Sequence, residues 1–154
     1  MKRLLFALLA CMPSLAAAAP SWLLVDGDSQ QVFEARNAEA RQPMGGLVSL
    51  MVFYTVYKEI RDDPAALDRK ITVTEEMAGV LAPEATRCTS KPGETLTVRQ
   101  ALQAIAVNGA QDACLALAQA ISEEKKISFV QRMNDNARAL RMPSTEYAAP
   151  FAQD

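Results

Sequence analysis

Ser49 has a residue type and a position that could support nucleophilic catalysis, because it lies on an expected helix. A serine hydroxyl is a weak nucleophile and needs an adjacent base to take its proton. One helical turn further on the residue is Val52, which cannot act as a base. Lys58 follows nine residues after Ser49, which is about 13 Å along a helix and too far for direct proton transfer. We therefore expect a structural role for Ser49, as a small helix residue bonded to the backbone.

The sequence offers few residues for other kinds of catalytic site or for a metal site. The 154 residues include no histidine, which excludes a His-based triad, a His general base and most zinc sites. Asp26 and Asp28 are two carboxylates in an expected turn, where such groups are usually solvated. Lys91, Pro92 and Gly93 have the composition of an ordinary turn. We predict neither a metal ion nor a cofactor.

The segment 43–61 is the element that would position Ser49. Its apolar residues recur at spacings of three and four: Leu47, Leu50, Met51 and Tyr54. This periodicity predicts a helix, and the nearly continuous apolar run 47–56 predicts that most of it is buried. Gly45 and Gly46 stand at its entry. They either precede the first turn or leave backbone N–H groups free for an anion, and we favour the first interpretation.

The rest of the chain predicts a β-hairpin followed by short strands and helices. The hairpin joins strands at 22–25 and 31–35 through the turn Asp26-Gly27-Asp28-Ser29. Thr74 and Thr97 are expected to cap helices. The remaining elements are expected to be a strand at 71–73, a weak strand or loop at 85–90, and helices at 77–81, 98–107, 111–122 and 124–139.

The first 18 residues predict a secretory signal peptide. Lys2 and Arg3 give a positive start, 4–10 is a short apolar run, and Ala16-Ala17-Ala18 fits a cleavage site. The apolar run is far shorter than the roughly 20 residues of a membrane-spanning helix. Cleavage after Ala18 leaves 19–154 as one domain exported to the periplasm. A lipoprotein signal with Cys11 as the lipid-attachment site is the less favoured alternative.

The composition of the expected mature chain limits its function further. Of 16 basic residues, the leader removes two, so 14 remain against 18 acidic residues and the net charge is −4. An acidic domain without a basic cluster argues against nucleic-acid binding. Cys88 and Cys114 remain after cleavage. Export permits a disulfide between them, and we favour equally the alternative of two buried free thiols.

Six segments stand in a recognisable order: SWLLVD at 21–26, RQP at 41–43, KPGE at 91–94, DACLALA at 112–118, FVQRMN at 129–134 and LRMPSTEY at 140–147. Together they resemble the serine D-alanyl-D-alanine carboxypeptidases, the low-molecular-mass penicillin-binding proteins. The resemblance implies an α+β fold of the penicillin-binding-protein and β-lactamase type. We expect its N-terminal β-hairpin and its helical half here, with the C-terminal strands of the sheet missing.

The chain departs from the family at its catalytic motifs. The family's Ser-x-x-Lys places an acylated serine and a proton-accepting lysine on one face of the central helix. By resemblance, Gly46 takes the serine position and Ser49 the lysine position. The family's Ser-x-Asn is replaced at Gly109 and Gln111. Its Lys-Thr-Gly has no counterpart before the chain stops.

The sequence therefore predicts a catalytically inactive periplasmic homologue that binds cell-wall peptide or another envelope protein in peptidoglycan metabolism. A two-stranded hairpin leaves an open sheet edge, so a homodimer through that edge is a further expectation. One alternative is a residual serine-type D-Ala-D-Ala carboxypeptidase whose missing motifs come from a partner chain. Another is a decayed gene product without function. We expect no nucleic-acid partner and no transmembrane segment.

Overall fold

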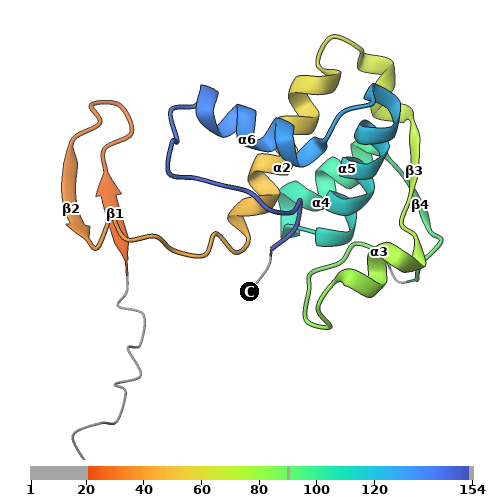
Figure 1. The fold of residues 1–154 in the computed structure, drawn as a ribbon, viewed down its shortest axis with the longest axis horizontal. Coiled ribbons are helices and arrows are strands. Elements are labelled where there is room, and N and C mark those ends of the chain that lie inside the picture. Colours follow the sequence, from red (N-terminus) through yellow and green to blue (C-terminus); the bar gives the residue numbers. More distant parts are fainter. Residues whose placement is uncertain (1–20, 90, 153–154) are drawn as a thin grey trace, which may run out of the picture. The chain divides into compact units, whose positions relative to one another are not determined.

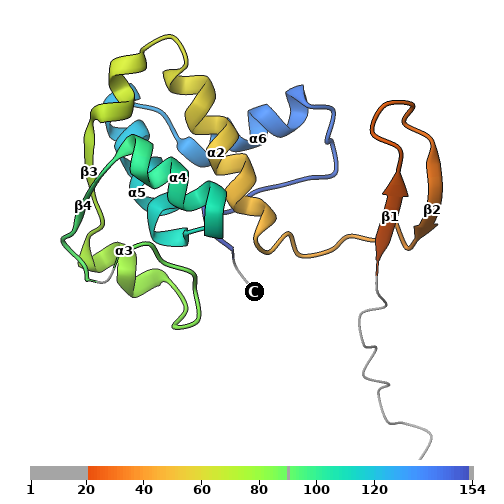
Figure 2. The ribbon, with the colours of Figure 1, turned by 180° about the vertical axis from the view of Figure 1, so that it is seen from behind.

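A computed structural model of the chain describes residues 21–89 and 91–152. The chain divides into one unit that ends at Gln42 and a second unit that begins at Pro43. The predicted leader at 1–18 lies outside the described residues. Figures 1 and 2 show the elements from two opposite sides.

The first unit is the predicted β-hairpin. Strands β1 (Trp22–Val25) and β2 (Val32–Arg36) pair antiparallel, with Leu23 opposite Ala35 and an irregularity between Leu24 and Val25. The Asp26 carboxylate closes the turn, because it accepts hydrogen bonds from the Ser29 N–H at 2.7 Å and the Ser29 hydroxyl at 2.6 Å. The turn that the sequence predicts between the two strands is therefore present, and Asp26 stabilises it.

Helix α2 (Leu47–Ile60) is the central element of the second unit, as the helical spacing predicts, but Leu47 and Leu50 of the expected buried face are 65% and 67% exposed. It lies against α4 (Val98–Asn108), α5 (Gln111–Lys125) and α6 (Phe129–Ala139), and the arrangement can be followed in Figure 1. The buried side chains of α2 are Val48, Ser49, Met51, Val52, Thr55, Val56 and Ile60. They form the core of this unit together with residues of the three other helices.

Two short helices begin at the threonines that the sequence marks as caps. Thr74 precedes α3 (Glu75–Val80), and its hydroxyl accepts a hydrogen bond from the Met77 N–H at 3.2 Å. Thr97 precedes α4 and accepts from the Gln100 N–H at 3.1 Å. Each hydroxyl pairs one of the N–H groups that a helix start leaves without a partner.

The secondary structure differs from the expectation in three places. Strand β3 (Lys70–Thr72) pairs with β4 (Thr95–Thr97), a strand that the sequence analysis missed, and residues 85–89 form no strand. A 3-10 turn, η2, spans Pro64–Asp68. Helix α5 continues to Lys125, so the prediction that the last helix starts at 124 is wrong. The Ser128 hydroxyl caps α6 instead, accepting from the Gln131 N–H at 3.3 Å.

Candidate functional site

Ser49 lies in the first turn of α2, with 4% of its surface exposed. Its hydroxyl donates a hydrogen bond to the Gly109 carbonyl oxygen at 3.3 Å, across to the turn between α4 and α5. This contact agrees with the predicted role of a small helix residue bonded to the backbone. A cavity of about 380 Å³ opens beside it and is lined by Gly46, Ser49, Leu50, Phe53, Ile105, Ala106 and Gly109.

Gly46 is the N-cap residue of α2, with φ −61° and ψ −15°. A side chain added there would meet open space, so the cavity has room at this position. The N–H groups of Leu47, Val48 and Ser49 donate to the carbonyls three residues earlier at 3.0–3.2 Å. These N–H groups are therefore occupied, which contradicts the interpretation that Gly45 and Gly46 free them for an anion.

Gly109 also lines this cavity, at the junction of α4 and α5, whereas Gln111, the first residue of α5, does not line it. Gly109 has φ +68°, a conformation that favours glycine, and its N–H donates to the Ile105 carbonyl at 2.9 Å. The Gln111 N–H donates to the Thr86 carbonyl at 2.8 Å. The structure thus brings together Gly46, Ser49 and Gly109 of the four positions that the sequence analysis singled out, while Gln111 begins α5 beside them.

Lys58, considered above as a base for Ser49, is engaged elsewhere. Its amine donates to the Asn136 side-chain oxygen on α6 at 2.8 Å and lies 5.7 Å from the centre of the Tyr54 ring. Asn136 in turn donates to the Thr55 hydroxyl at 3.0 Å, which is a buried contact between α6 and α2. These bonds give Lys58 a structural role in joining two helices.

Asp112 is a fully buried carboxylate whose importance the sequence analysis missed. It accepts hydrogen bonds from the N–H groups of Cys88, Thr89 and Ala113 and from the Thr89 hydroxyl, at 2.7–3.1 Å. Burial raises the pKa of Asp112, but the bonds from Thr89, Cys88 and Ala113 outweigh burial and hold it below its ordinary value. Asp112 therefore stays ionised and fixes residues 88–89 to the start of α5.

Cys88 and Cys114 are free thiols in the structure. Cys114 is buried and Cys88 is half-buried. Burial is the largest cause that raises the pKa of Cys114 to about 11 and that of Cys88 to about 12, and the Asp112 charge adds to both. Both groups are therefore neutral thiols at neutral pH and poor nucleophiles.

The remaining predicted positions show ordinary turn geometry. Asp26 is bonded within its own turn, and Gly93 lies in the turn after Lys91 with φ +89°. Within residues 21–89 and 91–152 no group of three or more Cys, Asp or Glu side chains could hold a metal ion. In the same part of the chain, no helix has both the length and the hydropathy needed to span a bilayer.

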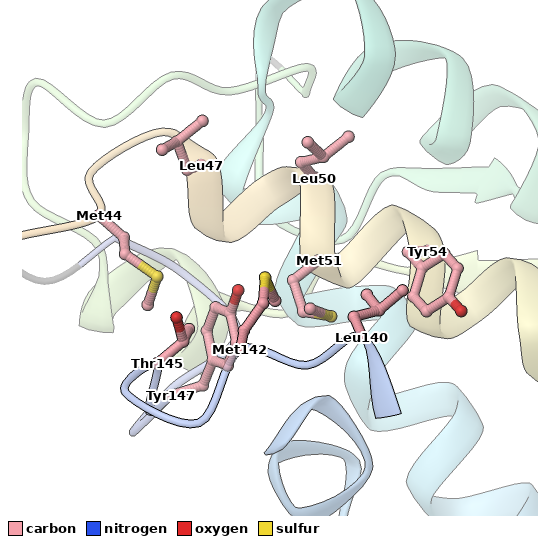
Figure 3. Close-up of a pocket in the computed structure, with 9 residues that line it drawn as sticks. All are labelled: Met44, Leu47, Leu50, Met51, Tyr54, Leu140, Met142, Thr145 and Tyr147. Carbon is pink, nitrogen blue, oxygen red and sulfur yellow. The ribbon is translucent and has the colours of Figure 1, made fainter. Parts of the chain in front are cut away.

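A second, larger concavity was not foreseen. It has a volume of about 540 Å³ and lies between α2 and the segment that follows α6. Figure 3 shows its lining residues: Met44, Leu47, Leu50, Met51, Tyr54, Leu140, Met142, Thr145 and Tyr147. No charged side chain lines this concavity, which we call the α2 groove. Its chemistry suits apolar side chains.

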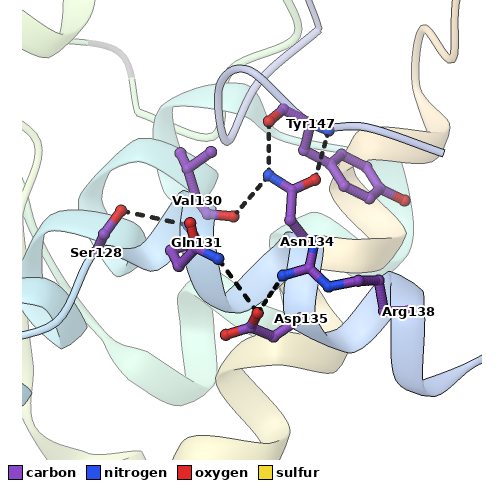
Figure 4. A network of polar contacts seen from close by, with 7 residues as sticks. All are labelled: Ser128, Val130, Gln131, Asn134, Asp135, Arg138 and Tyr147. Carbon is purple, nitrogen blue, oxygen red and sulfur yellow. Dashed lines mark hydrogen bonds and ion pairs between the residues drawn. The ribbon is translucent and has the colours of Figure 1, made fainter. Parts of the chain in front are cut away.

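The wall of the α2 groove formed by residues 140–147 is fastened to α6. Asn134 donates to the Tyr147 carbonyl at 2.9 Å and accepts from the Tyr147 N–H at 2.8 Å. The same side chain donates to the Val130 carbonyl at 3.1 Å. Figure 4 shows these bonds beside the exposed contacts of Gln131 and Arg138 with Asp135. The segment 140–147 thus becomes part of a defined surface.

The fold and the sequence both place this chain in one family. A model of the D-alanyl-D-alanine carboxypeptidase family matches residues 10–152. The chain therefore belongs to the D-alanyl-D-alanine carboxypeptidase family, as the resemblance in the sequence indicated. The α+β fold, with an N-terminal antiparallel hairpin, small sheets and a helical body, is that of the penicillin-binding proteins.

Individual relatives agree with this assignment. The D-alanyl-D-alanine carboxypeptidase DacC of Escherichia coli is 28% identical over 140 residues, which cover 88% of this chain and 34% of DacC. DacF of Bacillus subtilis is 26% identical over 136 residues, with the same two coverages. The chain thus spans about a third of the length of these curated relatives.

Solved structures show the same relationship. DacD from Francisella tularensis superposes with a TM-score of 0.74 at 25% identity and covers 92% of this chain and 33% of DacD. Penicillin-binding protein 6B from Escherichia coli superposes with a TM-score of 0.73 at 27% identity, covering 88% of this chain and 44% of that protein.

Proposed function

We propose that the chain is a catalytically inactive homologue of the D-alanyl-D-alanine carboxypeptidases that acts by binding in peptidoglycan metabolism. The observation that carries this proposal is the pair Gly46 and Ser49 at the start of α2. In the motif that the family resemblance implies, these positions hold the serine nucleophile and the lysine base. Glycine has no side chain to acylate, and a serine hydroxyl cannot take a proton from a neighbour as an amine does.

The surroundings of Ser49 support the same proposal. Its hydroxyl is directed at a backbone carbonyl, and the next turn of α2 offers Val52. The amine of Lys58 is held by Asn136. Loss of a nucleophile alone costs several powers of ten in rate. The alternative, an enzyme completed by a partner chain, would need that partner to supply the nucleophile as well as the missing base.

The cavity beside Gly46, Ser49 and Gly109 is the candidate binding site. Gly46, Ser49 and Gly109 line it, and by the family resemblance these are positions of the nucleophile, the base and the Ser-x-Asn motif. The relatives are named for an activity on D-alanyl-D-alanine, so a peptide with this terminus is the ligand to test. We further propose that residues 1–18 direct the chain to the periplasm, where such peptides occur.

An intact mass spectrum of the purified, non-reduced protein, with and without excess penicillin, tests the proposal. We expect an unchanged mass, while DacC, which is named as a D-alanyl-D-alanine carboxypeptidase, serves as the positive control. A stoichiometric adduct would overturn the proposed inactivity. The variant Ser49→Ala would then show whether Ser49 carries the adduct.

Binding is tested separately, by titrating a peptide that ends in D-Ala-D-Ala into the protein and recording the changes in the protein's NMR chemical shifts. Shifts confined to residues beside Gly46 and Gly109 are expected, and the matched peptide ending in L-Ala-L-Ala is the control. Equal shifts with both peptides, or no shifts at all, would contradict the proposed ligand.

A further inference from the structure

The cavity beside Gly46, Ser49 and Gly109 has an uncharged lining. The other residues that line it are Leu50, Phe53, Ile105 and Ala106. No described residue of this lining carries a charge, and the two stretches that supply it, 43–57 and 100–111, contain no Asp, Glu, Lys or Arg. A carboxylate that leaves water needs a cation or several hydrogen-bond donors. The side chains of this lining offer it no cation.

Hydrogen-bond donors beside the cavity already have acceptors. The N–H groups of Leu47, Val48 and Ser49 donate within the first turn of α2. The Gly109 N–H donates to the Ile105 carbonyl, and the Ser49 hydroxyl gives its proton to the Gly109 carbonyl at 3.3 Å. The oxygen of that hydroxyl keeps lone pairs that can accept a hydrogen bond. The cavity therefore suits a ligand N–H better than a carboxylate, which can only accept.

A buried negative charge lies behind Ser49. The Ser49 hydroxyl is within hydrogen-bonding reach of the Cys114 thiol, two residues beyond Asp112. Burial is the largest cause that raises the pKa of this thiol, the Ser49 hydroxyl lowers it, and the negative charge of Asp112 raises it further. The ionised Asp112 thus acts on a group in contact with the cavity wall. A second negative charge in the cavity would be repelled by it.

The cation in the segment that Asp112 holds is engaged elsewhere. Arg87 precedes Cys88, whose N–H donates to Asp112. Its guanidinium donates to four backbone carbonyls within 81–85, at 3.1–3.3 Å. Arg87 therefore fastens its own loop and its donors are directed away from an anion in the cavity.

We propose that this cavity takes a D-alanyl unit whose carbonyl end is an amide, in preference to one that ends in a free carboxylate. The methyl group of the alanyl unit packs against Leu50 and Phe53, and the amide N–H donates to the Ser49 hydroxyl oxygen. This inference rests on the proposed function, because it takes a D-alanyl peptide as the ligand. It adds that the ligand is recognised in an uncharged form.

Two peptides that differ only at the C-terminus test this preference. One is N-acetyl-D-Ala-D-Ala with a free carboxylate, and the other is the same peptide with a C-terminal amide. NMR titration gives a dissociation constant for each. We expect the amide to bind about tenfold more tightly, because the carboxylate loses water without gaining a partner.

The outcomes of this comparison separate the inference from the proposed function. Equal binding of the two peptides, or tighter binding of the carboxylate, would overturn the inference and leave the proposed ligand in place. Binding of neither peptide would overturn both.

A cation introduced at the cavity provides a second test. Ala106 is exposed on α4 and lines the cavity, so Ala106→Arg brings a guanidinium to its wall. We expect this variant to bind the carboxylate peptide about tenfold more tightly than wild type does, with little change for the amide. Val107→Arg is the matched control, because Val107 is 86% exposed on the same helix and does not line the cavity. The same response from both variants would contradict the assigned site.

The variant Ser49→Ala tests the assigned hydrogen bond. It removes the acceptor for the amide N–H, so the preference for the amide peptide is expected to fall while binding of the carboxylate peptide stays the same. Circular dichroism checks that the variant keeps its helical content. A folded Ser49→Ala with the full preference for the amide would overturn this part of the inference.

Discussion

Asn134 and Tyr147 hold each other through two hydrogen bonds in opposite directions, from one side chain to both backbone groups of the other residue. Thirteen positions separate them in the sequence. An amide side chain pairs a backbone N–H and C=O in the way that a neighbouring strand would. The contact therefore gives the irregular segment after α6 a fixed place.

Replacing Asn134 by alanine is expected to destabilise the fold by about 1–3 kcal/mol, because the half-buried backbone groups of Tyr147 lose their partners. Urea denaturation measures this change. Gln131→Ala on the same helix is the control, since Gln131 bonds only the exposed Asp135 through its side chain, and it is expected to change stability by less than about 0.5 kcal/mol. Equal effects of the two variants would contradict the assigned role of Asn134.

Asp112→Asn is expected to lower stability at neutral pH by about 1–3 kcal/mol, because an amide cannot replace a carboxylate that accepts from four donors. The NH₂ group of asparagine would instead face a backbone N–H. Urea denaturation at pH 7 measures the loss. An unchanged stability of Asp112→Asn would show that residues 88–89 are held by other contacts.

The same carboxylate predicts a pH dependence. The folded-state pKa of Asp112 lies below its ordinary value of 3.8, so in acid the unfolded chain binds a proton before the folded chain does. The stabilisation of the folded state by ionised Asp112 is fully present above pH 3.8 and is lost as the pH falls through the lower, folded-state pKa. Wild type is therefore expected to lose stability in that range more steeply than Asp112→Asn, and parallel stability profiles would contradict this.

The two thiols are expected to react slowly with iodoacetamide at pH 8 in the folded protein. Their pKa values of about 12 for Cys88 and about 11 for Cys114 leave little thiolate at that pH. Labelling in urea should be fast and complete for both, and Cys88→Ser isolates the signal of Cys114. Absence of labelling in urea before reduction would instead indicate a disulfide between them.

Gly109→Ala and Gly46→Ala are expected to change the stability of the fold in opposite directions. Gly109 has φ +68° and closes α4 in a left-handed conformation, so alanine there should cost about 1 kcal/mol. Gly46 has an ordinary helical conformation and open space, so alanine there should stabilise by up to about 1 kcal/mol. Thermal unfolding compares the two variants. A destabilised Gly46→Ala would mean that something besides backbone freedom requires glycine at that position.

Features that depend on near neighbours were predictable from the residues. The Asp26 turn, the threonine caps at Thr74 and Thr97 and the apolar run of α2 each rest on contacts within a few positions. The residues at Gly46 and Ser49 were also informative without coordinates, because the absence of a side chain or an amine is a property of the residue itself. The family membership followed from the order of short segments and is confirmed.

Features that depend on distant segments were not predictable. Strand β4 exists because Lys70–Thr72 pairs with it, and Asp112 is buried because residues 88–89 supply its donors. The start of α6 was misplaced because several polar residues before Ser128 suit a helix equally well, and α5 continues through them. The α2 groove arises where residues 140–147, tied to α6 by Asn134, lie against α2. A local pattern cannot specify such a surface, because its walls come from segments about 90 positions apart that only folding brings together.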